Sequence, residues 1–226
     1  MKSEEPIAVR ENHEPQLVCI DYDGVLVDSL DRMVYLLGRA QAAIGVGRAP
    51  TAADLQNVFN LNLYDLAIAL GIPPERIPEF ERSASRIQRE DRSRPAMFPG
   101  IPRVLRQIAE GSAIAIVSFN LRDEILDVLS AHHLEDCVSL VSDGSDSRPK
   151  RERIRLTLEH LGVYAHKAFM VGDARSDIRE GRAAGVQTVA VTWGYQPREA
   201  LAAEGPDFMA THPRDLLAIV KGRVRA

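Results

Sequence analysis

The sequence predicts an α/β protein with a doubly wound parallel sheet, and two features of the chain support this. Short apolar runs, most of them rich in valine and isoleucine, recur along it, and each is too short to form a helix. Such runs are typical of strands that are buried on both faces. Amphipathic helical patterns fill the gaps, and alternation of strand and helix favours a parallel sheet. The expected strands cover residues 17–20, 113–117, 138–141, 168–171 and 188–191.

The helices expected between the later strands carry apolar residues at helical spacing. Asn120 and Asp123 are positioned to cap the start of the first of these helices. Gly162 and Gly185 follow the last apolar positions of the other two, where glycine commonly ends a helix. We therefore expect helices over residues 120–134, 151–162 and 176–185.

One long stretch interrupts the alternation of strand and helix. From about residue 30 to residue 95 the patterns are helical, as in "LNLYDLAIALG", and no strand is expected. The segment "MFPGIPRVLRQIAEG" then leads back to the sheet, with Pro99 and Gly100 at the turn. A helical insertion after the first strand is the most economical interpretation. It divides the chain into a flexible N-terminal tail (1–15), an α/β core domain (16–29 and 96–226) and a helical domain (30–95).

The composition of the 226-residue chain limits the classes of partner and the cellular locations that we expect for it. A formal net charge of −4 argues against a general nucleic-acid-binding protein. The apolar runs are far too short to cross a bilayer, and the polar N-terminus lacks the apolar region of a signal peptide. Cys19 and Cys137 make no disulfide framework and are expected to be small buried side chains. We expect a cytoplasmic monomer or homodimer without nucleic-acid or membrane partners.

Polar residues follow the expected strands, at the edge where an open parallel sheet gathers its chemistry. Asp21 and Asp23 come after the first strand, Ser118 after the second, and Asp173 and Asp177 after the fourth. Carboxylates that crowd one edge of a sheet repel one another and need a cation. Hard oxygen ligands of this kind suit Mg²⁺. We therefore expect the four aspartates to form a Mg²⁺ site.

The same residue types predict a reaction. A carboxylate such as Asp21 can attack phosphorus and form an aspartyl-phosphate. Asp23, two residues on, can protonate the leaving oxygen and then activate water. Ser118 can hold the phosphoryl oxygens together with Lys150 or Arg148, which precede an expected helix. This division of roles predicts the hydrolysis of a phosphate ester, with a small phosphorylated metabolite as the substrate.

Four segments together resemble a known family. "DYDGVLVDS", "VSFN", a basic residue before a helix, and "VGDARSD" resemble the four ordered motifs of the haloacid dehalogenase superfamily, from about Leu17 to the C-terminus. The segment "VTWGYQPREAL" is similar to the phosphoglycolate-phosphatase-like branch, and the insertion resembles the family's helical cap. Val25 stands where the family usually has a threonine, which removes one hydroxyl. The resemblance implies a Rossmann-like core, Mg²⁺ and a phosphatase.

Carried over to this chain, the resemblance implies a role for each matching residue. Asp21 would be the nucleophile and a Mg²⁺ ligand. Asp23 would be the general acid and base, and its backbone carbonyl would also bind Mg²⁺. Ser118 would donate a hydrogen bond to the phosphoryl group, Asp173 would help to hold Mg²⁺, and Asp177 would ligate it through water or support the site. The residues expected to contact the substrate are Gly24, Phe119, Asn120 and Arg148.

The cation of the third motif is open between two residues. Arg148 followed by Pro149 fits a register in which Lys-Pro precedes a helix that ends in Leu-Gly. Lys150 fits a register in which the helix starts at the lysine itself. A compact ammonium can bridge the nucleophile and a phosphoryl oxygen at once, whereas a guanidinium prefers a planar, bidentate partner. On this chemistry we predict Lys150 as the catalytic cation.

Other functions fit these residues less well. A dehalogenase would need neither Asp23 nor Mg²⁺, and a phosphonatase would need a cap lysine, but no lysine lies between Lys2 and Lys150. A phosphomutase of the β-phosphoglucomutase type shares the four motifs and is one alternative, although no protective cap residues are evident after Asp28. A non-catalytic phosphate-binding or signalling module is another, although no catalytic carboxylate is missing.

Several other conspicuous residues have simpler interpretations. Asp28 and Ser29 are expected to lie at a helix N-terminus without a chemical role. Trp193 and Tyr195 are expected to pack in the core or against the cap. A set of arginines shares one face of a cap helix. We interpret this face as solvated rather than as a surface that attracts an anionic substrate. These arginines are Arg82, Arg86 and Arg89.

Overall fold

The computed structural model describes residues 17–58, 60 and 62–222, so the predicted flexible tail over residues 1–15 lies outside the described residues. Its centre is a six-stranded sheet in the order β5-β4-β1-β6-β7-β8, and every neighbouring pair is parallel. The predicted fold class is therefore confirmed. The strands are β1 (Leu17–Ile20), β4 (Ala113–Val117), β5 (Leu140–Ser142), β6 (Ala168–Gly172), β7 (Gln187–Val191) and β8 (Phe208–Ala210).

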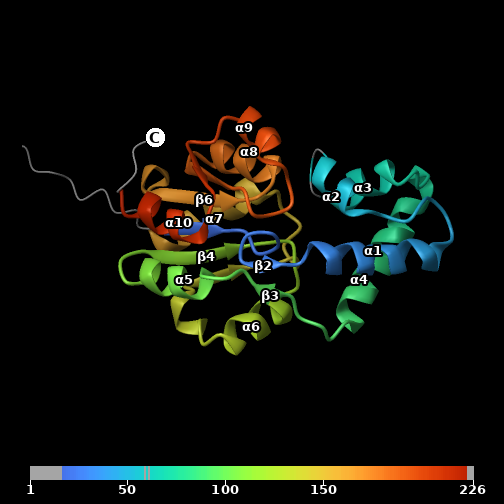
Figure 1. Ribbon diagram of the computed structural model, residues 1–226, viewed down its shortest axis with the longest axis horizontal. Helices are drawn as coiled ribbons and strands as arrows, with labels where there is room; N and C mark the ends of the chain where they lie inside the picture. Colours follow the sequence, from blue (N-terminus) through green and yellow to red (C-terminus); the bar gives the residue numbers. More distant parts are fainter. Residues whose placement is uncertain (1–16, 59, 61, 223–226) are drawn as a thin grey trace, which may run out of the picture.

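The sheet is wound outward from its middle, where β1 lies between β4 and β6 (Figure 1). After β1 the chain builds β4 and β5 on one side, and it then crosses over to build β6, β7 and β8 on the other. The register pairs Ile20 of β1 with Ile116 of β4 and with Val171 of β6. The carboxyl ends of these three strands therefore meet at one edge, where the winding reverses direction.

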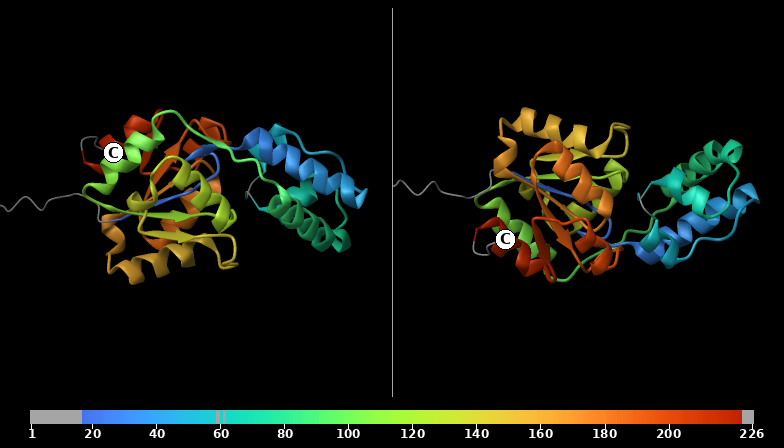
Figure 2. Two further views of the ribbon diagram at one scale, coloured as in Figure 1. Left: turned by 90° about the horizontal axis from the view of Figure 1, so that it is seen from below. Right: turned by 90° about the horizontal axis from the view of Figure 1, so that it is seen from above.

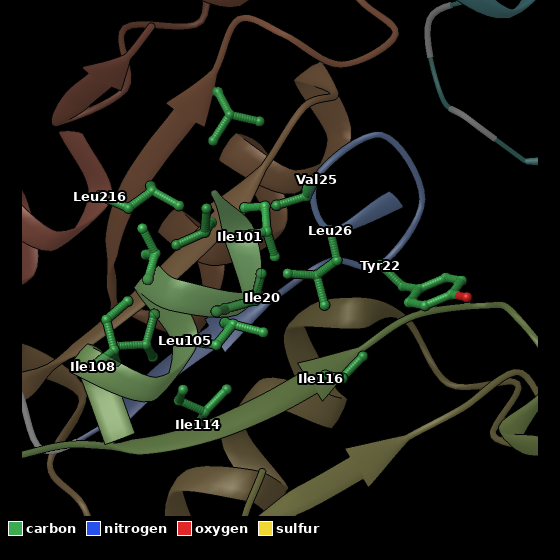
Figure 3. Close-up of a cluster of buried hydrophobic side chains, with 14 of the residues drawn as sticks. Ile20, Tyr22, Val25, Leu26, Ile101, Leu105, Ile108, Ile114, Ile116 and Leu216 are labelled. Atoms are coloured by element: carbon green, nitrogen blue, oxygen red, sulfur yellow. The ribbon is translucent and has the colours of Figure 1, made fainter. Parts of the chain in front are cut away.

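Helices cover both faces of the sheet (Figure 2). Alternate residues of a strand point to opposite faces, so Val18 and Ile20 belong to a larger core while Leu17 and Cys19 belong to a smaller one. Figure 3 shows part of the larger core around Ile20. Helices α5, α6 and α10 pack on this face, and α7, α8 and α9 pack on the other. Their bounds are α5 (Ile101–Ala109), α6 (Arg122–Ala131), α7 (Lys150–Leu161), α8 (Arg175–Ala184), α9 (Arg198–Ala203) and α10 (Pro213–Val220).

Residues 30–90 form a separate group of helices, which we call the helical unit. It lies on the side toward which the strands of the sheet point (Figure 1). Its own apolar core includes the buried side chains of Leu36, Leu55 and Phe80. The chain leaves and re-enters the core through a short antiparallel ladder of β2 (Val27–Asp28) and β3 (Ala96–Met97). The helices of the unit are α1 (Leu30–Ile44), α2 (Ala52–Asn57), α3 (Leu63–Ala69) and α4 (Ile77–Glu90).

Some details of the strands differ from the prediction. β5 begins at Leu140 rather than at residue 138, because a 3₁₀ turn over Glu135–Cys137 precedes it and Val138 still belongs to the loop. β8 and the β2–β3 ladder add to the predicted strands. Strands of two or three residues carry too little periodic signal to be recognised in a sequence. Two further 3₁₀ turns cover Pro74–Arg76 and Ala165–Lys167.

The ends of the core helices confirm one expectation and correct another. Gly162 and Gly185 end α7 and α8 in the left-handed conformation, as predicted. The prediction that Asn120 and Asp123 cap the N-terminus of α6 is wrong. The N-cap residue of this helix is Leu121, and no side chain forms a capping hydrogen bond there. The side chain of Asn120 turns instead toward the candidate site described below.

Two expectations from composition can be compared with the structure. Cys19 is buried in β1, Cys137 is half-buried, and both are free thiols. Within the part of the chain that the structure describes, no helix is both long enough and apolar enough to span a membrane.

Candidate active site

The candidate site is built on the carboxyl ends of the three central strands. Asp21 directly follows β1, and its N–H donates to the carbonyl of Val171 at 3.0 Å, so the sheet ladder holds the backbone up to this residue. Ser118 directly follows β4, and Asp173 directly follows β6. The topology thus brings residues that are distant in the sequence to one edge of the sheet.

Lys150 connects two of the carboxylates. It is the first residue of α7, it is 6% exposed, and its Nζ donates to Asp21 Oδ2 at 2.8 Å and to Asp177 Oδ1 at 2.6 Å. Carboxylate oxygens of Asp21, Asp173 and Asp177 all lie within 4.8 Å of one another. One ammonium therefore faces three carboxyl groups, and the cluster has an excess of potential negative charge.

Burial and mutual repulsion change the ionisation of this cluster. Burial, with repulsion from Asp177 and Asp21, raises the pKa of Asp173 well above its ordinary value. Burial also raises the pKa of Asp177, although the Lys150 ammonium opposes this. For Lys150, burial disfavours the charge, but attraction to Asp177 and Asp21 outweighs it and raises the pKa. A divalent cation among these carboxylates would relieve the repulsion.

Asp23 is turned away from the other aspartates. Its Oδ1 accepts a hydrogen bond from the Ser29 hydroxyl at 2.7 Å, and its Oδ2 accepts one from Asn120 Nδ2 at 3.0 Å. Burial raises the pKa of Asp23 to about 6, with Ser29 and Asn120 opposing the shift and Asp21 and Glu124 adding to it. A carboxyl group with such a pKa can both give and take a proton near neutral pH.

Two glycines leave room for the carboxylate of Asp173. A Cβ on Gly24 would lie 2.0 Å from Asp173 Oδ2, and the φ of Gly24 is +71°, which side chains rarely adopt. A Cβ on Gly194 would lie 2.4 Å from the same oxygen. The backbone N–H of Tyr195 donates to this oxygen at 2.7 Å. Gly24 is thus placed against the aspartate cluster, and a larger residue at this position would displace Asp173.

The segment after β4 carries three of the predicted site residues. Ser118 is buried, and its Oγ accepts a hydrogen bond from the N–H of Asn120 at 3.1 Å. Asn120 is also buried and joins Asp23 to Glu124, because its Nδ2 lies 2.9 Å from Glu124 Oε1. Phe119 is 53% exposed, and the Lys150 Nζ lies 5.9 Å from its ring centroid. Asn120 therefore lies against Asp23 and Phe119 against Lys150, and Ser118 precedes them at the end of β4.

Arg148, the other candidate for the third-motif cation and a predicted substrate contact, lies outside the cluster. Its guanidinium donates to both carboxylate oxygens of Asp146, at 2.9 and 2.8 Å. The Arg148 side chain is 52% exposed. Pro149 forms the N-cap of α7, so the helix starts at Lys150 and directs this side chain, rather than that of Arg148, to Asp21.

Two residues that we expected to lack a chemical role lie in contact with Asp23 or its partner. Ser29 donates to Asp23, and its hydroxyl lies 2.8 Å from the hydroxyl of Tyr195. Tyr195 also packs in the apolar core of the helical unit, so the expected contact with the inserted helices is observed. The sequence signal for Ser29 was its position six residues after Asp23, but a serine before a helix is far more often a simple N-terminal residue.

The helical unit contacts the core on two sides of the site. From α4, Gln88 Nε2 donates to Asn120 Oδ1 at 2.8 Å. On the other side, Arg175 and Gln196 donate to the carbonyl of Val58, at 3.1 and 2.9 Å. The arginines predicted to form a solvated face of α4 are exposed, and one of them pairs with a glutamate on the same helix. These arginines are Arg82, Arg86 and Arg89.

The chain is similar to known sequences of one family. The sequence model of the haloacid dehalogenase-like hydrolase family matches residues 18–191. A phosphoglycolate phosphatase from Synechococcus elongatus is 29% identical over 214 residues, covering 93% of this chain and 99% of that protein. The pyrophosphatase PpaX from Bacillus pumilus is 39% identical over 113 residues, covering 49% of this chain and 52% of that protein.

Solved structures share the fold. A haloacid dehalogenase-like hydrolase from Streptococcus pneumoniae superposes with a TM-score of 0.79 at 21% identity, covering 91% of this chain and 98% of that one. A predicted phosphoglycolate phosphatase from Haemophilus somnus gives a TM-score of 0.75 at 20% identity, covering 90% and 97%. The match of the family over most of the chain confirms the resemblance that the motifs indicated. The chain belongs to the haloacid dehalogenase-like hydrolase family.

Proposed function

We propose that this hydrolase is a Mg²⁺-dependent phosphatase that cleaves a small phosphate monoester through an aspartyl-phosphate on Asp21. The observation that carries the proposal is the contact between Asp21 and Lys150 at 2.8 Å, beside Asp173 and Asp177. Lys150 Nζ bonds to Oδ2 of the candidate nucleophile Asp21 and not to its Oδ1. Relatives that carry the names phosphoglycolate phosphatase and pyrophosphatase support phosphate chemistry.

The first step uses the carboxylate of Asp21. One of its oxygens attacks phosphorus, and the bond between phosphorus and the ester oxygen breaks. Lys150 offsets the negative charge that gathers on the phosphoryl oxygens, and the hydroxyl of Ser118 donates to one of them. The leaving oxygen takes a proton from Asp23, which becomes a carboxylate. The product of this step is an alcohol and a phosphorylated Asp21.

The second step returns the enzyme to its starting state. A water molecule attacks phosphorus, and Asp23 takes one of its protons. The bond between phosphorus and Asp21 then breaks and releases inorganic phosphate. Asp23 suits both tasks because burial raises its pKa to about 6, and because Ser29 and Asn120 hold its two oxygens in fixed positions.

The residues present fit a divalent cation. Asp21, Asp173 and Asp177 offer carboxylate oxygens within 4.8 Å of one another, and the ammonium of Lys150 leaves their charge undercompensated. Hard oxygen donors of this kind favour Mg²⁺. When bound, Mg²⁺ would supply charge neutralisation between the nucleophile and the phosphoryl group. The side chain of Asp23 lies outside this group of carboxylates and bonds to Ser29 and Asn120, so its backbone carbonyl is the group that we propose as its metal ligand.

We also infer that a cap domain covers residues 30–95 and contains the helical unit, and that the core domain comprises residues 16–29 and 96–226. Two observations support this division. The helical unit has its own apolar core. Its contacts to Asn120 and to Arg175 flank the aspartate cluster, so its position decides which leaving group can reach Asp21.

The test is a panel of phosphate esters that includes 2-phosphoglycolate, sugar phosphates, nucleotides and pyrophosphate. We expect Mg²⁺-dependent release of phosphate from at least one of them, and no release in excess chelator. The Asp21→Asn variant should be inactive, because an amide is a poor nucleophile. Beryllium fluoride should form its adduct on Asp21 in the wild-type enzyme. An adduct on Asp23, or full activity of the Asp21→Asn variant, would contradict the mechanism.

A further inference from the structure

Arg153 lies on the same face of α7 as Lys150, one turn further along the helix. It is 1% exposed, whereas most arginines in proteins reach solvent. Its Nη2 donates to the carbonyl of Ser118 at 2.6 Å, and its Nε donates to the hydroxyl of Ser142 at 2.9 Å. Nη2 also contacts the carbonyl of Ser142. The guanidinium thus joins the ends of β4 and β5, and Ser118 is one of the predicted site residues.

Burial of the Arg153 guanidinium carries a desolvation cost. Among the described residues, no carboxylate forms an ion pair with Arg153, and its buried Nη1 has no hydrogen-bond partner. Burying a guanidinium is unfavourable, and attraction to the nearby carboxylates of Asp146, Asp21 and Asp143 offsets only part of this cost. A role beyond packing is therefore needed to account for Arg153.

Hydrogen bonds to its backbone carbonyl groups fix the loop over residues 118–120. Arg153 binds the carbonyl of Ser118, and the N–H of Gly144 donates to the carbonyl of Asn120 at 2.7 Å. The carbonyl of Phe119 lies so close to Gly144 that a Cβ there would be 2.1 Å from it. The loop therefore has little freedom to rotate its peptide groups.

Fixing a carbonyl also fixes the neighbouring amide. The C=O of one residue and the N–H of the next belong to the same planar peptide and point in opposite directions. When Arg153 draws the carbonyl of Ser118 toward α7, it directs the N–H of Phe119 away from α7. The ring of Phe119 lies over the guanidinium, with the Arg153 Cζ 4.9 Å from its centroid, so the side chain of the same residue is held as well.

We propose that Arg153 is a positioning residue of the phosphoryl site, which holds the Ser118–Phe119 peptide so that the Ser118 hydroxyl and the Phe119 N–H are directed at the phosphoryl group. The inference rests on the proposed phosphatase function. A planar guanidinium suits this task because it can hold the ends of two strands at once, which a single ammonium cannot do.

The test compares Arg153→Met and Arg153→Lys with a matched control. Arg155→Met is the control, because Arg155 lies on the same helix and also donates to a backbone carbonyl, that of Ala183, away from the site. We expect kcat of Arg153→Met to fall by about tenfold or more, with a smaller change in KM, since the held donors act on developing charge. Arg153→Lys should recover part of kcat, and Arg155→Met should keep it.

A second readout does not depend on turnover. Inorganic phosphate with Mg²⁺ is titrated into ¹⁵N-labelled protein, and the amide resonance of Phe119 is followed. We expect a shift in the wild type and in Arg155→Met, a reduced one in Arg153→Lys, and none in Arg153→Met. If Arg153→Met does not fold, the Arg153→Lys variant decides, and wild-type values of kcat and of the Phe119 shift in it would overturn the proposal.

Other outcomes distinguish a structural Arg153 from a protein that is not a phosphatase. A folded Arg153→Met variant with a lower Tm but wild-type kcat and a wild-type Phe119 shift would reduce Arg153 to a structural residue and overturn the inference. A wild-type enzyme that cleaves no phosphate ester would contradict the proposed function. In that case a phosphate-induced shift of Phe119 that Arg153→Met abolishes would still support the positioning role.

Discussion

Arg32 and Glu124 form a two-pronged ion pair between the helical unit and the core. Nη1 and Nη2 of Arg32 donate to the two carboxylate oxygens of Glu124, at 3.0 and 2.9 Å. The Nε of Arg32 donates to Asp91 at the end of α4, at 2.9 Å. Glu124 also accepts a hydrogen bond from Asn120, which donates to Asp23. A chain of hydrogen bonds therefore runs from the two ends of the helical unit to the predicted general acid.

Replacing Arg32 by methionine should destabilise the protein. The Glu124 side chain is 2% exposed, so it would keep a buried negative charge without its counter-ion. Breaking a buried pair in this way costs roughly 3 kcal/mol of unfolding free energy. Chemical denaturation of Arg32→Met and wild type measures the difference.

Arg86→Met is the matched control for Arg32→Met. Arg86 pairs with Glu90 on the surface of α4, and both side chains are more than half exposed. Exposed pairs of this kind contribute at most about 0.5 kcal/mol on a helix. Equal stability of the two variants would show that the Arg32–Glu124 pair does not join the units.

Lys150→Ala and Arg148→Ala should separate the two candidates for the third-motif cation. Lys150 contacts Asp21 and Asp177, whereas Arg148 pairs with Asp146 at the surface. Losing the cation at the phosphoryl site should cost about 2 kcal/mol or more of transition-state stabilisation. We expect a large loss of kcat/KM for Lys150→Ala at saturating Mg²⁺, and near wild-type values for Arg148→Ala. A large loss for Arg148→Ala with near wild-type values for Lys150→Ala would instead identify Arg148 as the third-motif cation.

Asp173→Ala should weaken Mg²⁺ binding more than Asp177→Ala does. The oxygens of Asp177 bond to Lys150 and to the N–H of Ala174, so part of its capacity is already used. Asp173 accepts from the N–H of Tyr195, which leaves more of its oxygen surface for a metal. Calorimetric titration with Mg²⁺ gives the affinities directly. Equal affinity of wild type and Asp173→Ala would remove Asp173 from the set of ligands.

Gly144→Ala should disturb the loop after β4. The added Cβ would lie 2.1 Å from the carbonyl oxygen of Phe119, and this backbone atom cannot move without shifting the loop. We expect lower kcat and a loss of stability of about 1–3 kcal/mol, the usual result of overpacking. Gly38→Ala is the control, because Gly38 lies inside α1 and its nearest neighbour would be 3.9 Å away. There alanine should raise helix stability slightly. A Gly144→Ala variant with wild-type kcat would contradict the view that this loop must be held.

The central sheet could be predicted because its strands are buried on both faces. Four of the five expected strands lie within one residue of the predicted bounds, since runs such as Ala113–Val117 must be apolar throughout. β5 lies at the edge of the sheet and is half-buried, so its apolar run does not coincide with the strand, and the predicted start at residue 138 is wrong.

Without the family resemblance, a candidate site residue can be predicted from the sequence where its residue type implies chemistry by itself. Carboxylates at the ends of strands do so, which is why Asp21 and Asp173 were recognisable. Arg153, Glu124 and Ser29 are different, because arginine, glutamate and serine are common on helices and at helix starts. Their importance comes from partners that lie far away in the sequence, such as the contact of Arg153 with Ser118. Only the tertiary structure reveals these partners.

The β2–β3 ladder also affects how the protein could be re-engineered. Val27 pairs with Met97 and Asp28 pairs with Ala96, so the chain departs from and returns to the sheet at adjacent points. All six strands of the core lie outside the stretch between these two junctions. Another domain whose N- and C-termini lie side by side could be inserted there in place of the helical unit. The same hydrolytic machinery could then be given a new choice of leaving group.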